Sequence, residues 1–245
     1  MDNYLNVKHN FANLDDVIIH YVVAGDGPPV VLLHGWPQTW WEWRHVIPVL
    51  SQNYTVIAPD LRGLGDSSRP LIGYDKKTVA YDIWRLMNEI LGYSNFFVVG
   101  HDWGAPICWT TAAYYKEKIT AVIGLSVPFT RRGKISSTKL WQKLYKNIFF
   151  YQNYFQYENI PEKELEKNIC ETLLKIFYWC SEEGFQDKIK SNTKLNSGLL
   201  DSITLPAKDR LKKLKLNFLK KLINDFEKSV FRGSLNRYRA QNLDC

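Results

Sequence analysis

The decisive stretch of this chain reads Phe96-Phe97-Val98-Val99-Gly100-His101-Asp102-Trp103-Gly104-Ala105. The four apolar residues before Gly100 are typical of a buried parallel strand, and a helical pattern begins after Gly104 and continues to about Lys116. Gly100 and Gly104 flank Asp102 because so sharp a turn leaves no room for side chains beside its central residue. The stretch therefore predicts a strand, a tight elbow that carries Asp102, and a helix.

Asp102 itself has two interpretations. Gly-x-Asp-x-Gly at a strand-to-helix turn is typical of a nucleophile elbow, here with aspartate in the place where serine is usual. The turn lifts the carboxylate off the sheet, and the N-terminus of the following helix favours its negative charge. An acidic residue is also a common helix N-cap, so the motif alone leaves both interpretations open.

Further strands and helices alternate along the first half of the chain. Strand-like segments occupy residues 17–23, 30–33, 55–58 and 119–127, and helical patterns occupy residues 41–51 and 77–91. Short buried strands that alternate with helices predict an α/β fold with a doubly wound, mostly parallel sheet. Ligands of such sheets bind beyond the carboxyl ends of the strands, where Pro37, Asp60 and Asp102 are expected.

The pattern changes after residue 128. The alternation stops, helices are indicated over residues 161–180 and 208–228, and aromatic residues are dense between 149 and 157. We therefore expect residues 1–128 to form the N-terminal part of an α/β core and residues 129–245 to form a helical lid over the strand ends.

Composition and charge exclude several classes of protein. The hydrophobic share of 45% in 245 residues suffices for a core, and we find neither a signal peptide nor an apolar run of membrane-spanning length. The four cysteines lack metal-type spacing and are too few for a disulfide scaffold. We expect a cytoplasmic protein with no metal and no cofactor.

The net charge of +7 is concentrated in the second half. Residues 1–130 carry 9 Lys and Arg against 12 Asp and Glu, and residues 131–245 carry 23 against 13. The lysines gather in residues 208–221, together with apolar residues at helical spacing: Leu211, Leu214, Phe218, Leu219, Leu222, Ile223 and Phe226. This pattern favours an amphipathic helix with a solvated face over a nucleic-acid or membrane partner.

Several motifs now agree in order and spacing. His34-Gly35-Trp36-Pro37, Asp60-x-Arg62-Gly63-x-Gly65-Asp66-Ser67 and Gly100-His101-Asp102-Trp103-Gly104 resemble the α/β-hydrolase family, and more narrowly its epoxide hydrolase branch. In the second half, Tyr151-Gln152-Asn153-Tyr154-Phe155-Gln156 and Phe231-Arg232-Gly233-Ser234-Leu235-Asn236-Arg237-Tyr238-Arg239 are similar to the segments that carry the paired lid tyrosines of soluble epoxide hydrolases.

The resemblance implies a role for each group. Asp102 would attack an epoxide carbon and form an alkyl-enzyme ester, while Tyr151 and Tyr238 would hold and protonate the epoxide oxygen. The backbone N–H groups of Trp36 and Trp103 would stabilise the oxyanion when the ester is hydrolysed.

The resemblance also implies a cis Trp36–Pro37 bond. Trp36, Pro37, Trp103, Tyr151, Phe155 and Tyr238 would line an apolar pocket for a small epoxide. Without the resemblance, an aromatic such as Tyr151 is more simply explained as a core residue.

The second half of the reaction lacks its usual residues. In this fold the chain order is nucleophile, acid and then histidine. The five histidines are His9, His20, His34, His45 and His101, and all precede Asp102. We therefore expect a C-terminally truncated chain that forms the ester and stalls, without two strand–helix units of about 30 residues each. The strand at residues 119–127 should then be an uncovered edge.

Two other functions remain open. Haloalkane dehalogenases share Asp-Trp-Gly but usually carry asparagine where this chain has Trp36, and they lack the lid tyrosine pair. Fluoroacetate dehalogenases carry arginine where this chain has Trp103. The alternative outside enzymes is a non-catalytic protein that kept the ligand pocket and lost turnover. The oligomeric state is not indicated.

Overall fold

The computed structural model describes residues 5–131, 133–189, 198–203 and 216–244. The chain divides into a first unit, Met1–Arg132 with Asp244, and a second unit, Gly133–Leu243 with Cys245. Each unit is described by itself below.

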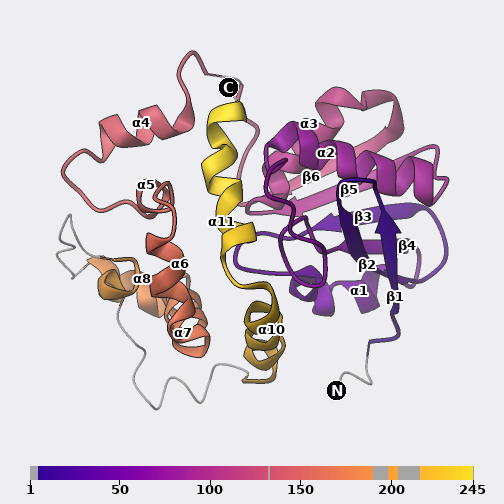
Figure 1. The fold of residues 1–245 in the computed structure, drawn as a ribbon. Helices are drawn as coiled ribbons and strands as arrows, with labels where there is room; N and C mark the ends of the chain where they lie inside the picture. The colour runs from indigo at the N-terminus through magenta and orange to yellow at the C-terminus, as the bar shows by residue number, and fades with distance from the viewer. Residues whose placement is uncertain (1–4, 132, 190–197, 204–215, 245) are drawn as a thin grey trace. The chain divides into compact units, whose positions relative to one another are not determined.

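A six-stranded sheet forms the centre of the first unit, with the order β1-β2-β4-β3-β5-β6 (Figure 1). Its strands are β1 (Lys8–Asn13), β2 (Ile18–Ala24), β3 (Pro29–Leu33), β4 (Thr55–Pro59), β5 (Phe96–His101) and β6 (Ile119–Leu125). β1 pairs antiparallel with β2, and β2 pairs antiparallel with β4. The other pairs are parallel, as predicted.

β1 is the strand that the sequence did not predict. Its residues, KHNFAN, show no alternation of apolar and polar side chains. Only Ala12 of this edge strand is buried, so the other positions need not be apolar. At the other edge, Ile123 and Leu125 of β6 are 53% and 42% exposed. In the described part of the chain β6 is thus the last strand of the sheet, the edge position expected for this segment.

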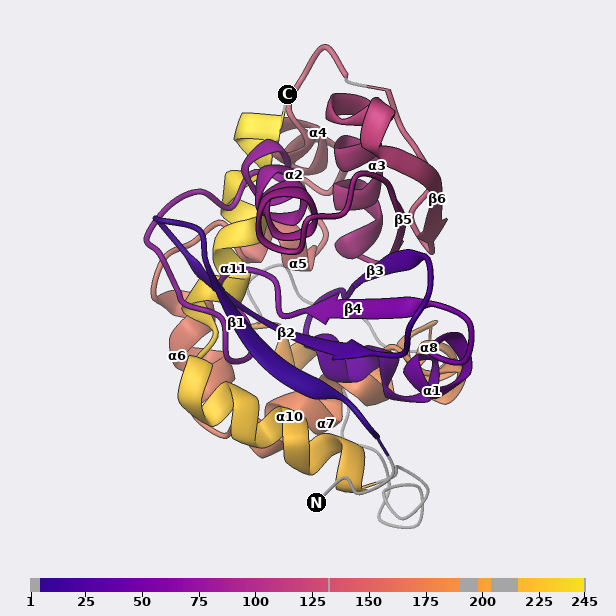
Figure 2. The same cartoon turned by 90° about the vertical axis from the view of Figure 1, so that its right-hand side faces the viewer.

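Helices cover both faces of the sheet (Figures 1 and 2). The 3₁₀ helix η1 (Trp40–His45) and the short α1 (Ile47–Leu50) lie on one face. α2 (Lys76–Trp84), which continues as the π-helical η2 (Arg85–Ile90), and α3 (Gly104–Tyr114) lie on the other, and the 3₁₀ turn η3 (Lys116–Lys118) leads into β6.

The helix predicted over residues 41–51 is wrong in detail. η1 ends at His45 and α1 begins at Ile47. Pro48 lies in the first turn of α1, and it has no N–H to donate to a carbonyl four residues earlier. A continuous α-helix through this point is therefore excluded.

A buried ion pair connects the loop after β4 to α2. Arg62, 1% exposed, donates from Nε and Nη2 to the two carboxylate oxygens of Asp82, each at 2.6 Å. Its Nη1 reaches Asp16 at 3.1 Å. Burial lowers the pKa of the Arg62 guanidinium, but the bonds and charges of Asp82 and Asp16 outweigh this and raise it. The arginine therefore stays charged inside the protein.

We expect Asp82→Ala to destabilise the fold by about 3–5 kcal/mol, because it leaves a buried guanidinium without its main partner. Asp16 is the matched control, since its side chain is 61% exposed, and Asp16→Ala should cost about 1 kcal/mol or less. Urea unfolding of both variants measures the difference. Equal decreases in the free energy of unfolding for the two variants would show that the buried Arg62–Asp82 pair stabilises the fold no more than the exposed contact with Asp16.

The second unit is helical in its described residues. Its helices are α4 (Ser137–Leu144), α5 (Tyr151–Tyr154), α6 (Ile160–Glu166), α7 (Ile169–Trp179), α8 (Glu182–Ile189), η4 (Leu200–Ser202), α10 (Leu216–Ser229), α11 (Arg232–Arg239) and η5 (Ala240–Asp244). α7 packs against α6, α8 and α10. No helix in the described part of the chain is long and apolar enough to cross a membrane.

Two helix predictions in this unit need correction. The single helix expected over residues 161–180 is two helices, because Asn168 is extended and caps α7 by accepting the Glu171 N–H. Of the helix expected over 208–228, α10 provides the part from residue 216, where Leu219, Leu222 and Phe226 are buried. Residues 208–215, with Leu211 and Leu214, lie outside the described residues.

Candidate active site

The predicted elbow joins β5 to α3 in the first unit. Asp102 has a φ of 49°, in the left-handed region that side chains rarely adopt. A Cβ on Gly104 would collide with the carbonyl oxygen of Leu33, and one on Gly100 would collide with the Gly104 carbonyl. The two glycines are thus required by close backbone packing, as the sequence indicated.

The Asp102 carboxylate points to the loop that follows β3. Its Oδ1 accepts the backbone N–H of Trp36 at 2.8 Å, and the carboxylate also accepts the backbone N–H of Trp103. Burial raises the pKa of this carboxyl above its ordinary value, and the two N–H bonds oppose that rise without cancelling it. The N-cap residue of α3 is Trp103. A carboxylate bound across to another loop is not in an N-cap arrangement.

The loop at residues 34–37 approaches the elbow closely. A Cβ on Gly35 would overlap the Asp102 side chain, so only glycine fits there. The Trp36–Pro37 bond is cis. The structure thus brings Asp102, Trp36 and Trp103 together within the first unit and places Pro37 beside them in the chain.

Glu42 is a residue of this site that the sequence analysis missed. Its Oε2 accepts the Gly35 N–H at 2.9 Å, and its Oε1 bonds to Nδ1 of His101. It therefore links the loop before η1 to the residue that precedes Asp102. A carboxylate within the otherwise apolar run Trp40-Trp41-Glu42-Trp43 was the available signal, since an acid that is largely withdrawn from water needs partners.

The Glu42–His101 pair predicts a dependence of stability on pH. The hydrogen bond from His101 to Glu42 raises the pKa of His101 above its ordinary value, and burial opposes this. The stabilisation is complete below the unfolded histidine pKa of about 6.5 and is lost as the pH rises through the higher folded value. Urea unfolding across this range should show the loss, and Glu42→Gln should reduce it. Identical pH profiles for the two proteins would contradict the assignment.

His34 has a structural role. It is fully buried, its Nε2 accepts the Leu61 N–H at 2.9 Å, and its Nδ1 lies 2.9 Å from the Gly35 carbonyl oxygen. Because Nε2 accepts, Nδ1 must carry the proton and donate. Both ring nitrogens are therefore engaged in holding the loop.

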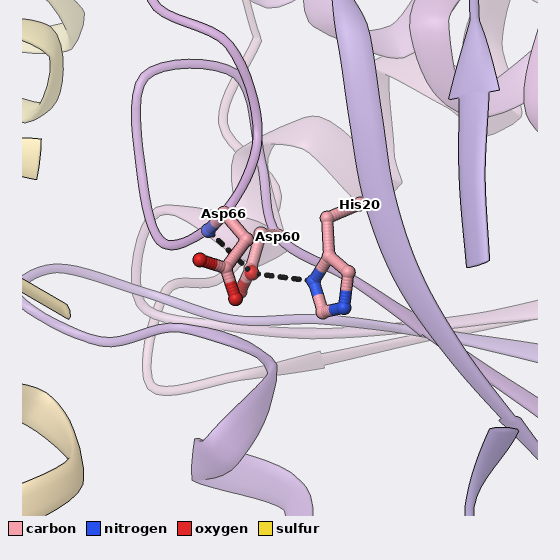
Figure 3. A group of neighbouring side chains, drawn as sticks. All are labelled: His20, Asp60 and Asp66. Atoms are coloured by element: carbon pink, nitrogen blue, oxygen red, sulfur yellow. Dashed lines mark hydrogen bonds and ion pairs between the residues drawn. The ribbon is translucent and has the colours of Figure 1, made fainter. Parts of the chain in front are cut away.

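Figure 3 shows His20, Asp60 and Asp66, the group that could most readily offer metal ligands among the described residues. Asp60 Oδ2 lies 2.7 Å from Nδ1 of His20 and accepts the Asp66 N–H at 3.0 Å, and its Oδ1 accepts the Trp40 N–H at 2.8 Å. Burial raises the pKa of Asp60, but the bond from His20 and its charge outweigh this and lower it.

With three donors on Asp60, a cation would have to displace bonds that already satisfy a buried carboxylate. The group therefore anchors the loop after β4 to β2 and η1.

The two tyrosines singled out from the sequence, Tyr151 and Tyr238, meet inside the second unit. The rings of Tyr151, the first residue of α5, and Tyr238, in α11, lie 5.9 Å apart at 80°. Phe155 is fully buried and packs against both rings, at 5.6 and 5.0 Å. Gln152 donates to the Tyr151 hydroxyl at 3.0 Å. Tyrosines 87 positions apart in the sequence are thus held as a pair.

Hydrogen bonds from side chains to backbone carbonyls hold Tyr151 and Tyr238 together. Gln156 Nε2 donates to the Tyr238 carbonyl at 3.0 Å, and Arg239 Nε donates to the Phe155 carbonyl at 3.1 Å. Arg239 also pairs with Glu162 at 2.7 Å. α11 is therefore tied to the end of α5 and to α6. Asp102 and its N–H donors belong to the first unit, whereas the tyrosine pair belongs to the second.

Comparisons with a family model and with known proteins point to the same family. Residues 28–181 match the family model of the alpha/beta hydrolase fold. The chain is 53% identical over 103 residues to the soluble epoxide hydrolase of Corynebacterium sp. (strain C12), over 42% of this chain and 36% of that protein. It is 33% identical to epoxide hydrolase A of Mycobacterium tuberculosis, over 91% of this chain and 70% of that protein.

A solved structure of an epoxide hydrolase has the same fold as this chain. The crystal structure of epoxide hydrolase A from Mycobacterium thermoresistibile superposes with a TM-score of 0.87 at 31% identity, over 98% of this chain and 76% of that chain. The chain spans only 36–42% of the length of the first curated relatives it matches.

Proposed function

This chain belongs to the α/β-hydrolase family, in its epoxide hydrolase branch, and we propose that its Asp102 carboxylate opens small apolar epoxides. One observation carries the proposal: the Asp102 carboxylate stands in a left-handed elbow and accepts N–H groups from both Trp36 and Trp103. Those donors hold the carboxylate in place, which orients it for attack.

The first step forms an ester. A carboxylate oxygen of Asp102 bonds to an epoxide carbon, and the bond from that carbon to the epoxide oxygen breaks. The alkoxide that leaves takes a proton from the hydroxyl of Tyr151 or Tyr238, since a tyrosine with a pKa of about 10 is still protonated at neutral pH. This requires the second unit to act as a lid that brings the tyrosine pair over Asp102, which is part of the proposal.

The second step is hydrolysis of the ester. Water attacks the ester carbonyl carbon, and the N–H groups of Trp36 and Trp103 would then stabilise the oxyanion. The acyl C–O bond breaks, the diol leaves with one proton of the water, and the other proton goes to solvent as the Asp102 carboxylate is restored. No histidine follows Asp102 in this sequence, and His34 has both ring nitrogens engaged. We infer that this polypeptide alone accumulates the ester and releases diol slowly.

The cellular setting is also proposed. We expect a cytoplasmic location, supported by Cys108 and Cys170, which are free thiols and so suit a reducing compartment. No cofactor enters the proposed chemistry.

A comparison of two substrates with different leaving groups tests this function. The protein is incubated with styrene oxide or with 1-bromobutane, and its intact mass and the released bromide are followed. We expect one epoxide adduct per chain and no bromide above the protein-free rate. Bromide release without an epoxide adduct would indicate a dehalogenase. Neither product would indicate a ligand-binding protein without the chemistry.

A further inference from the structure

The first helix of the second unit, α4, has one face turned into the unit. Thr138 is 4% exposed, and its hydroxyl donates to the side-chain oxygen of Asn242. The ring of Trp141 meets the ring of Phe150 edge to face, with centroids 5.5 Å apart. Because Thr138 and Trp141 are three positions apart, they lie on the same face of the helix. This face holds α4 in place.

The other side of α4 is basic. Lys139 and Lys143 are exposed and four positions apart, so they share a side of the helix that points away from Thr138. One further exposed lysine precedes the helix and another follows it. We refer to these four residues as the α4 basic surface: Lys134, Lys139, Lys143 and Lys146.

Carboxylates do not neutralise the α4 basic surface. Residues 118–157 contain neither aspartate nor glutamate. None of the four lysines is ion-paired within the described part of the chain. Elsewhere in the same unit Lys175 pairs with Glu171 at 3.1 Å, and Lys221 pairs with Asp225 at 2.5 Å. The α4 basic surface is therefore a concentrated positive charge that favours an anionic partner.

Apolar side chains stand among these lysines. Ile135 is 52% exposed, Leu144 is 59% exposed and Ile148 is 58% exposed. Each of the three lies within two positions of a lysine of the α4 basic surface. A nucleic acid would match the charge and leave these side chains in water. The surface of a lipid bilayer offers phosphate groups and, just below them, acyl chains, so it matches both kinds of residue.

We propose that the α4 basic surface binds membranes that contain anionic phospholipids. The lysines lie among the headgroups, and Ile135, Leu144 and Ile148 enter the boundary with the acyl chains. Such a contact is peripheral, in keeping with the lack of a membrane-spanning helix among the described residues. The surface is distinct from the lysines of residues 208–221, and its role does not depend on the chemistry proposed for Asp102.

Sedimentation of the full chain with lipid vesicles tests the proposal. We expect binding to vesicles of phosphatidylcholine with phosphatidylserine, little binding to phosphatidylcholine alone, and release as salt is added. Each lysine near an anionic membrane contributes roughly fivefold to the partition coefficient. Replacement of all four lysines of the α4 basic surface by glutamine should therefore reduce partitioning by at least about a hundredfold.

A matched control removes the same charge from other positions of the second unit. Its four substitutions, all to glutamine, are at exposed lysines of α6 and α10 or next to them: Lys163, Lys167, Lys220 and Lys228. This variant should stay within about fivefold of the wild type, since charges farther than a Debye length from the membrane are screened. All eight positions are exposed, so both variants should keep the wild-type melting temperature.

Leu144→Gln separates a lipid partner from a nucleic acid. It removes an apolar side chain and no charge, so it should weaken vesicle binding severalfold and leave any binding to a short DNA duplex unchanged. Three results would overturn the proposal: wild type that does not sediment with phosphatidylserine vesicles, equal losses in the two lysine variants, or tighter binding to the duplex than to the vesicles. Alkylation of Asp102 is measured separately and is unaffected by any of them.

Discussion

Replacement of Asp102 by asparagine is expected to reduce alkylation by styrene oxide by about 10⁴-fold or more, the scale seen when a nucleophile is removed. An amide is far less nucleophilic than a carboxylate, and no other carboxylate stands at the elbow within reach of both the Trp36 and Trp103 N–H groups in the described residues. Intact mass as a function of time measures the rate. An adduct that forms equally fast in Asp102→Asn would place the chemistry elsewhere.

The same substitution should not unfold the protein. Burial raises the pKa of Asp102, so the charged carboxylate is less stable in the folded chain than in water. Asparagine removes that charge and keeps an oxygen that can accept the Trp36 N–H. We therefore expect a melting temperature equal to or above that of the wild type, which separates loss of chemistry from loss of fold.

The pH profile of the wild type gives an independent check on the nucleophile. Only the ionised carboxylate attacks, so alkylation should fall as the pH is lowered through the Asp102 pKa. Because that pKa is raised by burial, the midpoint should lie above the ordinary aspartate value of about 3.9. A midpoint below that value would contradict the burial argument.

Removal of the tyrosine hydroxyls is expected to have the second largest effect. A positioned proton donor contributes about 10²–10⁴-fold, so Tyr151→Phe with Tyr238→Phe should reduce alkylation by at least that factor. The ring contacts with Phe155 are kept in these variants, so the packing of the pair should persist. Rates come from the same mass measurement.

Tyr157→Phe is the matched control, since Tyr157 lies in the same segment as Tyr151 and is 59% exposed. It should alkylate at the wild-type rate. If the double variant reacts as fast as Tyr157→Phe, the tyrosine pair is a packing feature and donates no proton to the epoxide oxygen.

The sequence predicted those parts of the fold that depend on local pattern. The strand, elbow and helix around Asp102 follow from four apolar residues and two glycines, and all three are present. The parallel pairs of β3, β4, β5 and β6 follow from alternating strands and helices.

Features set by contacts between distant residues could not be predicted in this way. β1 has no apolar periodicity because one residue of its six is buried. Glu42 and His101 are 59 residues apart, and only the fold brings them together. The partner of Arg62 is Asp82 in α2. The sequence of the loop after β4, which carries Arg62, does not indicate this partner. In the second unit, the break between α6 and α7 depends on one capping residue, Asn168.

The most direct test of the account is the intact mass of the full chain after incubation with excess styrene oxide, followed by a peptide map of the product. We predict one persistent adduct per chain, linked as an ester to Asp102, on the peptide that contains the elbow. An adduct on a cysteine or histidine, or free diol formed with no adduct at Asp102, would contradict the proposal that Asp102 attacks the epoxide and that this chain accumulates the ester.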